Sequence, residues 1–193
     1  IYCKMIFDDD IKECIRVLKK GGLILYPTDT VWGIGADATN EEAVAKIYAL
    51  KRRNESKSMI ILLAGENDIL TYSAETHPTV FDFIKGVHKP VTVVYKNAKN
   101  LARNIINLDG SIGMRVVKSG FAKALVENFG KPVVSTSANL SGYPPPGNFG
   151  DIDIEIKRGV DYVVQHLSDD RSIATPSTVV TIDEKCEVII LRH

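Results

Sequence analysis

Residues 23–35, LILYPTDTVWGIG, combine the pattern of a core strand with that of a binding site. The first four residues form a short apolar run between two glycines and a proline, which is typical of a buried strand. Thr28, Asp29 and Thr30 follow, and they place two hydroxyls and a carboxylate at the carboxyl end of that strand. Ligands of open α/β sheets bind at this edge, so the stretch predicts a site as well as a strand. The alternative is an ordinary turn that joins a strand to a helix.

Gly33 and Gly35 close this stretch, where glycine allows a sharp turn or a close approach of the backbone to another group. Residues 33–38 also match a loosened form of the glycine-rich dinucleotide-binding pattern. However, residues 27–32 separate the strand from the glycines, so Gly33 cannot make the tight strand-to-helix turn that this motif requires. We therefore do not expect a dinucleotide site here.

The composition is that of an ordinary globular protein, with 45% hydrophobic and 25% charged residues in 193. We expect one domain over residues 1–193, since this length suits a single core. The 24 basic and 24 acidic residues cancel, so no overall field favours nucleic acid or an anionic membrane, and any anion site must be local. Cys3, Cys14 and Cys186 are too scattered for a disulfide framework or a zinc site, and no apolar run could span a membrane. These features predict a cytoplasmic protein.

Hydrophobic periodicity predicts helices and strands that alternate along the chain. We expect helices over residues 8–18, 39–50, 66–87 (in pieces), 101–106 and 121–129, and strands over residues 23–26, 59–63, 90–95, 112–117 and 132–134, with a hairpin of residues 177–182 and 186–192 at the end. Thr39 and Glu42 have the spacing of a capping box at the start of the second helix. The pattern predicts an α/β fold of the α+β type, in which helices flank a twisted mixed or parallel sheet. Residues 143–147 and 166–176 are the best candidates for lid loops.

Cationic and hydroxyl side chains recur at predicted strand ends and connections. Arg115 interrupts an apolar strand, and because burying a lone charge is very costly, it must either face solvent or hold an anion. Residues 135–139, STSAN, form a second polar strand end that repeats the pattern of residues 28–30, and two such edges can face one cleft. The candidate anion receptors and hydroxyl donors are Lys51, Arg53, Lys57, Arg115 and Arg192 with Thr28, Thr30, Ser135, Ser137 and Asn139. The basic residues from 51 to 57 also have a structural interpretation, as the complement of a helix dipole.

These residue types fit a nucleoside triphosphate site beside a small carboxylate substrate. Guanidinium groups bind carboxylates and phosphates bidentately, and lysines bind phosphate oxygens as point charges. The sequence has no serine-hydrolase elbow, zinc-protease helix or Walker A loop, and its four histidines are isolated. Chemistry at phosphorus can proceed by positioning and charge stabilisation, so the absence of an identifiable nucleophile is no objection.

Six segments, in this order, carry a resemblance to a known family: YPTDTVWGIG at 26–35, KRR at 51–53, PVT at 90–92, MRV at 114–116, STSANLSG at 135–142 and PSTVV at 176–180. Over nearly its whole length the chain resembles the YrdC family of threonylcarbamoyl-adenylate synthases. The resemblance implies a YrdC/RibB-like α/β sheet with a deep basic cleft. It also implies a nucleotidyltransferase that converts L-threonine, bicarbonate or carbon dioxide, and ATP with Mg²⁺ into threonylcarbamoyl-AMP and pyrophosphate. Downstream threonylcarbamoyl-transfer proteins would then use that product for the threonylcarbamoyladenosine modification at position 37 of tRNA.

The same resemblance implies roles for individual residues. The threonine site would comprise Thr30, Arg115, Ser135 and Ser177, with Arg115 on the carboxylate. The triphosphate would be held, and the departing pyrophosphate stabilised, by Lys51, Arg53 and Lys57. The nucleotide site would be completed by Ser137, Asn139 and Arg192. Lys51, Arg53 and Arg115 would be catalytic, and no protein side chain would bind the metal.

Some positions depart from the usual family pattern. Asn54 stands where proline is common, Trp32 where tyrosine or phenylalanine is usual, and Leu62 where some members have histidine. These departures leave room for a paralogue with a different substrate, and IGMR at 112–115 resembles the YciO branch. A further alternative is a module of the same fold that binds tRNA or double-stranded RNA without chemistry, although the zero net charge argues against this as its sole function.

Overall fold

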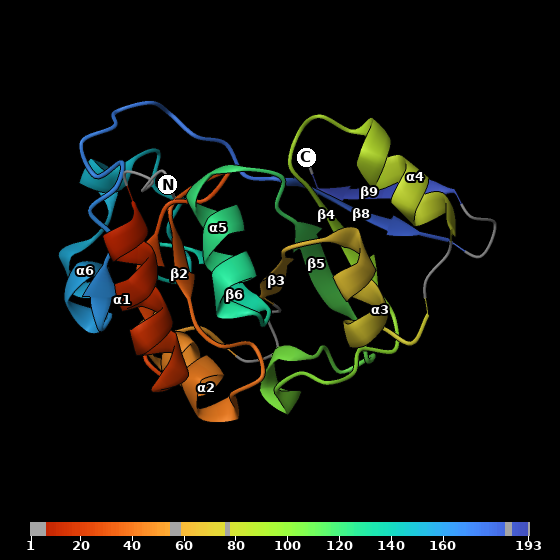
Figure 1. The fold of residues 1–193 in the computed structure, drawn as a ribbon, viewed down its shortest axis with the longest axis horizontal. Coiled ribbons are helices and arrows are strands. Elements are labelled where there is room, and N and C mark those ends of the chain that lie inside the picture. Colours follow the sequence, from red (N-terminus) through yellow and green to blue (C-terminus); the bar gives the residue numbers. More distant parts are fainter. Residues whose placement is uncertain (1–6, 55–58, 76–77, 184–186, 193) are drawn as a thin grey trace, which may run out of the picture.

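A nine-stranded mixed sheet organises the fold, with helices packed on it (Figure 1). The computed structural model describes residues 7–54, 59–75, 78–183 and 187–192. Within these residues the strand order is β7-β1-β2-β6-β3-β5-β4-β8-β9. The strands are β1 (Ile24–Tyr26), β2 (Gly33–Gly35), β3 (Ile60–Leu63), β4 (Val91–Tyr95), β5 (Ile112–Val116), β6 (Val133–Ser137), β7 (Tyr162–Val163), β8 (Thr178–Ile182) and β9 (Val188–Arg192).

The helices are α1 (Asp8–Lys19), α2 (Glu41–Leu50), α3 (Ile69–Tyr72), α4 (Pro78–Gly86), α5 (Gly120–Phe129) and α6 (Ile154–Gly159), with single 3₁₀ turns at Glu66–Asp68, Arg103–Ile105 and Phe149–Asp151. The start of α1 follows from its three consecutive aspartates, which favour the positive end of the helix dipole. α1 and α5 pack against each other, while α4 lies near β8 and β9 at the other end of the molecule (Figure 1). No described helix has both the length and the apolar composition that crossing a membrane would require.

The strand predicted at residues 23–26 is confirmed as β1, all of whose residues are buried. The two glycines of that stretch do not form a turn, because Gly33–Gly35 is itself a strand, β2, antiparallel to both β1 and β6. Gly35 is needed for close packing: a Cβ there would stand 2.7 Å from the Tyr26 ring and 3.1 Å from a Val133 methyl. Because β1 and β6 are both antiparallel to β2, their carboxyl ends lie at the same edge of the sheet.

Two other predictions need correction, and two short elements were not predicted. The N-cap of α2 is Asn40, whose side chain accepts a hydrogen bond from the Ala43 amide, while Thr39 donates its hydroxyl to Asp37 instead. Residues 135–137 do not follow a strand but belong to β6. Neither α6 nor β7 was expected from the sequence, since both are too short for a clear periodicity.

The remaining predicted elements are present, with ends shifted by a few residues. β8 and β9 pair antiparallel, as expected for a hairpin, although residues 184–186 of its connection lie outside the described residues. Cys3 and Cys186 also lie outside them, and Cys14 is a buried free thiol whose pKa burial raises.

Candidate functional site

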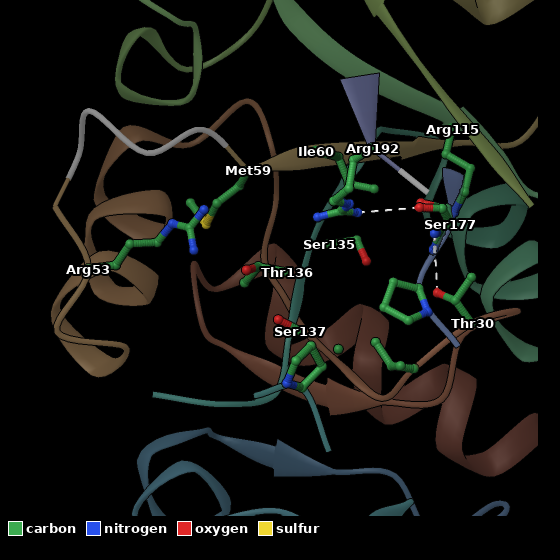
Figure 2. A pocket seen from close by; sticks show the side chains of 14 residues that line it. Thr30, Arg53, Met59, Ile60, Arg115, Ser135, Thr136, Ser137, Ser177 and Arg192 are labelled. Carbon is green, nitrogen blue, oxygen red and sulfur yellow. Dashed lines mark hydrogen bonds between the residues drawn. The ribbon is translucent and has the colours of Figure 1, made fainter. Parts of the chain in front are cut away.

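A cavity of about 160 Å³ lies where the carboxyl ends of β1 and β6 meet the amino end of β3 (Figure 2). Its lining comprises Thr30, Val31, Gly33, Arg53, Met59, Ile60, Arg115, Ser135, Thr136, Ser137, Pro145, Pro176, Ser177 and Arg192. Seven of the site residues expected from the sequence are among them: Thr30, Arg53, Arg115, Ser135, Ser137, Ser177 and Arg192. Both polar strand ends therefore reach one cavity, as the sequence pattern suggested.

Arg115 is buried at one end of this cavity, with 3% of its surface exposed. Its Nη2 lies 3.1 Å from Oδ1 of Asp29, and its Nη1 donates to the Thr30 hydroxyl at 3.2 Å. Nε has no hydrogen-bond partner within the described residues. Burial lowers the pKa of Arg115, the Asp29 carboxylate raises it and the nearby Arg192 lowers it, but a guanidinium stays charged in proteins. A buried cation with an unmatched N–H is suited to an anionic ligand.

Thr30 owes its position to a hydrogen-bonded turn after β1. The Thr28 hydroxyl donates to the Val31 carbonyl at 2.7 Å and accepts from the Thr30 amide at 3.0 Å. Thr28 does not line the cavity, so its contribution is to fix the turn that presents Thr30.

Ser177 precedes β8, and its hydroxyl contacts a buried residue outside the lining of the cavity. Its hydroxyl is 2.9 Å from that of Thr92, a residue of β4 with no exposed surface. Nη2 of Arg192, at the end of β9, reaches the Ser177 carbonyl at 3.4 Å (Figure 2). Ser177 and Arg192 thus lie on the same side of the cavity as Arg115.

Arg53 lies on the opposite side of the cavity from Arg115 and Thr30, with residues 135–137 between them (Figure 2). Burial lowers its pKa. The cavity therefore has two cationic ends, one formed by Arg115 and Arg192 and the other by Arg53, with hydroxyl groups between them.

Lys51 does not line the cavity but is fully buried beside it. Its ammonium group donates to the carbonyls of Ser137 and Asn139, the latter at 2.7 Å. The Lys51 carbonyl in turn accepts from the Ser141 amide at 2.9 Å, so this residue ties the end of α2 to the segment after β6. Burial and, to a lesser degree, Arg53 lower the pKa of Lys51 to about 7.

One other expected site residue, Asn139, lies apart from these. Asn139 lines a neighbouring cavity of about 170 Å³ together with Tyr143 and Asp151, and its Nδ2 donates to the Tyr143 carbonyl at 2.6 Å. Lys57 lies outside the described residues. Among the described residues there is no group of three or more His, Cys, Asp or Glu side chains that could hold a metal ion.

Two residues that support the site, Asp29 and Thr92, were not among the expected site residues. Asp29 stands inside the polar strand end after β1, but the sequence alone could not pair it with Arg115, which is far away in the chain. Thr92 interrupts an apolar strand, as Arg115 does, and a lone hydroxyl in a buried strand is a signal that could have identified it.

The sequence matches the Sua5/YciO/YrdC family, which is described as "Telomere recombination", over residues 16–193. A threonylcarbamoyl-AMP synthase of Escherichia coli is 36% identical over 143 residues, which cover 71% of this chain and 74% of that protein.

Two solved structures share the fold. P. abyssi Sua5, solved in complex with L-threonine, superposes on 98% of this chain with a TM-score of 0.86 and 24% identity, and the match covers only 55% of the Sua5 chain. Escherichia coli YciO superposes on 96% of this chain and 89% of its own, with a TM-score of 0.82 and 24% identity. At this identity the likeness establishes the fold alone. The match over residues 16–193 together with the 36% identical relative shows that the chain belongs to the Sua5/YciO/YrdC family.

Proposed function

We propose that the protein is an L-threonylcarbamoyladenylate synthase, which joins L-threonine, bicarbonate or carbon dioxide, and ATP into threonylcarbamoyl-AMP and pyrophosphate. The observation that carries the proposal is the buried guanidinium of Arg115, whose Nε has no partner within the described residues and which lies at one end of a hydroxyl-lined cavity. That arrangement suits the carboxylate of a small, hydroxylated amino acid.

The size of the cavity agrees with a site for the amino acid that is separate from most of the nucleotide site. Sites for drug-sized ligands measure about 300–1,000 Å³, so a partly open space of about 160 Å³ fits an amino acid rather than a whole nucleotide. Threonine would lie between Arg115, Thr30 and Ser177. The nucleotide would extend past Ser137 toward Arg53 and the segment that carries Asn139.

The reaction that we propose needs positioning and charge stabilisation rather than a protein nucleophile. The threonine amine adds to carbon dioxide and releases a proton to water, and an oxygen of the resulting carbamate then attacks the α-phosphorus in line. The bond from the α-phosphorus to the bridging oxygen breaks, and pyrophosphate leaves with that oxygen. Arg53 would neutralise the charge on the departing group, while Mg²⁺ would enter with ATP on its phosphate oxygens.

In this scheme Lys51 acts through the backbone, because its ammonium group already binds the Ser137 and Asn139 carbonyls. It would therefore fix the backbone that forms the phosphate-binding end of the site, rather than contact the triphosphate. The 36% identity to a threonylcarbamoyl-AMP synthase supports the proposal, and the shared fold of YciO identifies the alternative, a paralogue with another substrate.

The test is pyrophosphate release by the purified protein from ATP and Mg²⁺, with L-threonine and bicarbonate each present or omitted. Release that requires both would support the synthase. Release with a different amino acid, or binding of ATP without release, would contradict it and indicate a paralogue or an RNA-binding module. A parallel measurement with L-serine, which lacks only the methyl group of threonine, would show how closely the cavity fits its substrate.

A further inference from the structure

Asp29 contacts Arg115 without lining the cavity. Its Oδ1 is 3.1 Å from Nη2 of the guanidinium, and its side chain is 19% exposed against 3% for Arg115. The residues that surround the cavity include Arg115 and Thr30 but not Asp29. Asp29 therefore contacts the guanidinium that lines the cavity rather than a ligand inside it.

The charge balance at this end of the cavity depends on Asp29. Arg115 and Arg192 line the same side, and the charge of Arg192 disfavours that of Arg115. Asp29 is the carboxylate that pairs with Arg115 among the described ion pairs, and it offsets one of these two positive charges. Without it, two guanidinium groups would face a small, partly enclosed space, which is the arrangement that proteins use to bind phosphate-like dianions.

We propose that Asp29 determines the charge selectivity of the Arg115 end of the cavity, so that this end accepts an amino acid in preference to a phosphate-like dianion. The inference rests on the function proposed above, in which a triphosphate and an amino acid must occupy different ends of one site. A neutral zwitterion gains little from the removal of a nearby negative charge, since the effects on its carboxylate and its ammonium group oppose each other. A dianion has no such compensation, because the Asp29 carboxylate offsets the Arg115 charge that would otherwise attract it.

Asp29 is thus a positioning and specificity-determining residue, and it also orients Arg115. The partner-free Nε belongs to the guanidinium whose Nη1 and Nη2 contact Thr30 and Asp29. With those two groups engaged, the guanidinium is held in one orientation at the wall of the cavity.

The experiment is isothermal titration calorimetry of the full chain with two probes, inorganic sulfate and L-threonine. Sulfate is used because it remains a dianion across the neutral pH range. Asp29→Asn removes the charge at almost constant shape, and Asp29→Glu retains it. Asp82→Asn is the matched control, because it makes the same change in net charge at an exposed position of α4, none of whose residues lines the cavity. A double variant, Asp29→Asn with Arg115→Met, tests whether the effect passes through Arg115.

In Asp29→Asn we expect sulfate affinity to rise about tenfold relative to threonine affinity, and in Asp29→Glu and Asp82→Asn we expect the ratio to stay near that of the wild type. The gain in sulfate affinity should disappear in the double variant. A mere loss of structure would lower both affinities, so it cannot imitate this result. Unchanged sulfate affinity in Asp29→Asn, or a gain that persists without Arg115, would overturn the proposal. If the unaltered protein does not bind threonine, the proposed function fails, and sulfate binding alone still decides the role of Asp29.

Discussion

Arg115 is the residue whose side chain has the largest influence on the properties of the site. From the sequence it could either face solvent or hold an anion, because the cost of burying a charge excludes only the unpaired case. The structure buries it, pairs it with Asp29 and leaves one N–H directed to no described group. The sequence indicated Arg115 as a candidate site residue, because it is a single charge in an apolar strand. It did not indicate Asp29 as the partner, since the contact joins positions far apart in the sequence.

Replacing Arg115 by lysine should weaken threonine binding selectively. Lysine keeps the positive charge and can still pair with Asp29, but it lacks the planar, bidentate geometry of a guanidinium. We expect threonine affinity to fall at least about tenfold, while ATP affinity changes less than about twofold. Calorimetric titration with each ligand would measure both, with Arg103→Lys, whose arginine side chain is 93% exposed, as control. Equal threonine affinity in the two variants would refute the role assigned to Arg115.

Lys51 should make stability depend on pH. Its pKa is about 7 in the folded protein and 10.5 when unperturbed, so between these values the unfolded chain binds more protons. The free energy of unfolding therefore rises with pH over this range, by at most about 1.4 kcal/mol per unit. Urea denaturation at pH 7, 8 and 9 should show that the wild type gains stability relative to Lys51→Met as the pH rises.

The control for this prediction is Lys12→Met, which removes a lysine side chain that is 73% exposed. Its stability should follow that of the wild type at every pH. Parallel pH profiles for Lys51→Met and the wild type would show that the buried ammonium does not titrate in this range.

At the level of elements, β2 explains why both polar strand ends meet. Three residues, GIG, lie between β1 and β6 and pair with both. No periodicity can be detected in so short a strand. The sequence therefore indicated that the glycines have a structural role, but not that they belong to a strand. The same limit applies to α6 and β7, whereas longer elements such as α1, α5 and β4 show enough repeats to be predicted.

Gly35→Ala should destabilise the fold by about 1–3 kcal/mol. The added methyl group would stand 2.7 Å from the Tyr26 ring and 3.1 Å from side-chain carbons of Ile24 and Val133, all in the packed core. Gly86→Ala, at the end of α4, is a suitable control because its added methyl group would meet no neighbouring atom within 4 Å. Urea denaturation of both variants would decide, and a Gly35→Ala protein as stable as the control would show that the sheet can relax around β2.

At the scale of the whole molecule, the cavity joins distant parts of the chain. Its lining extends from Thr30 to Arg192 and includes residues of β2, β3, β5, β6 and β9. Such a site exists only when the sheet is assembled, so a ligand bound there stabilises the folded state as a whole. The zero net charge is consistent with attraction of anions at this local site rather than across the surface.

ATP with Mg²⁺ at 100 times its dissociation constant should stabilise the protein by about 2.7 kcal/mol. We expect this as a rise in the thermal unfolding midpoint. Arg53→Ala should reduce the rise at the same ATP concentration, since it removes the cation at the proposed phosphate end. Arg52→Ala is a neighbouring control with a 71% exposed side chain. The same rise in both variants would mean that the nucleotide binds elsewhere.

The sequence by itself determined the helices and strands that are long enough to show periodicity, the mixed α/β class and half of the residues that line the cavity. It could do so because burial imposes a regular pattern along each element, and because polar groups at strand ends stand out against that pattern. Tertiary structure alone decided the order of the strands, the pairing of Asp29 with Arg115, the support of Ser177 by Thr92 and the burial of Lys51 on backbone carbonyls. Each of these joins groups that are distant in the chain, so its energy depends on the assembled sheet and leaves no local trace in the sequence.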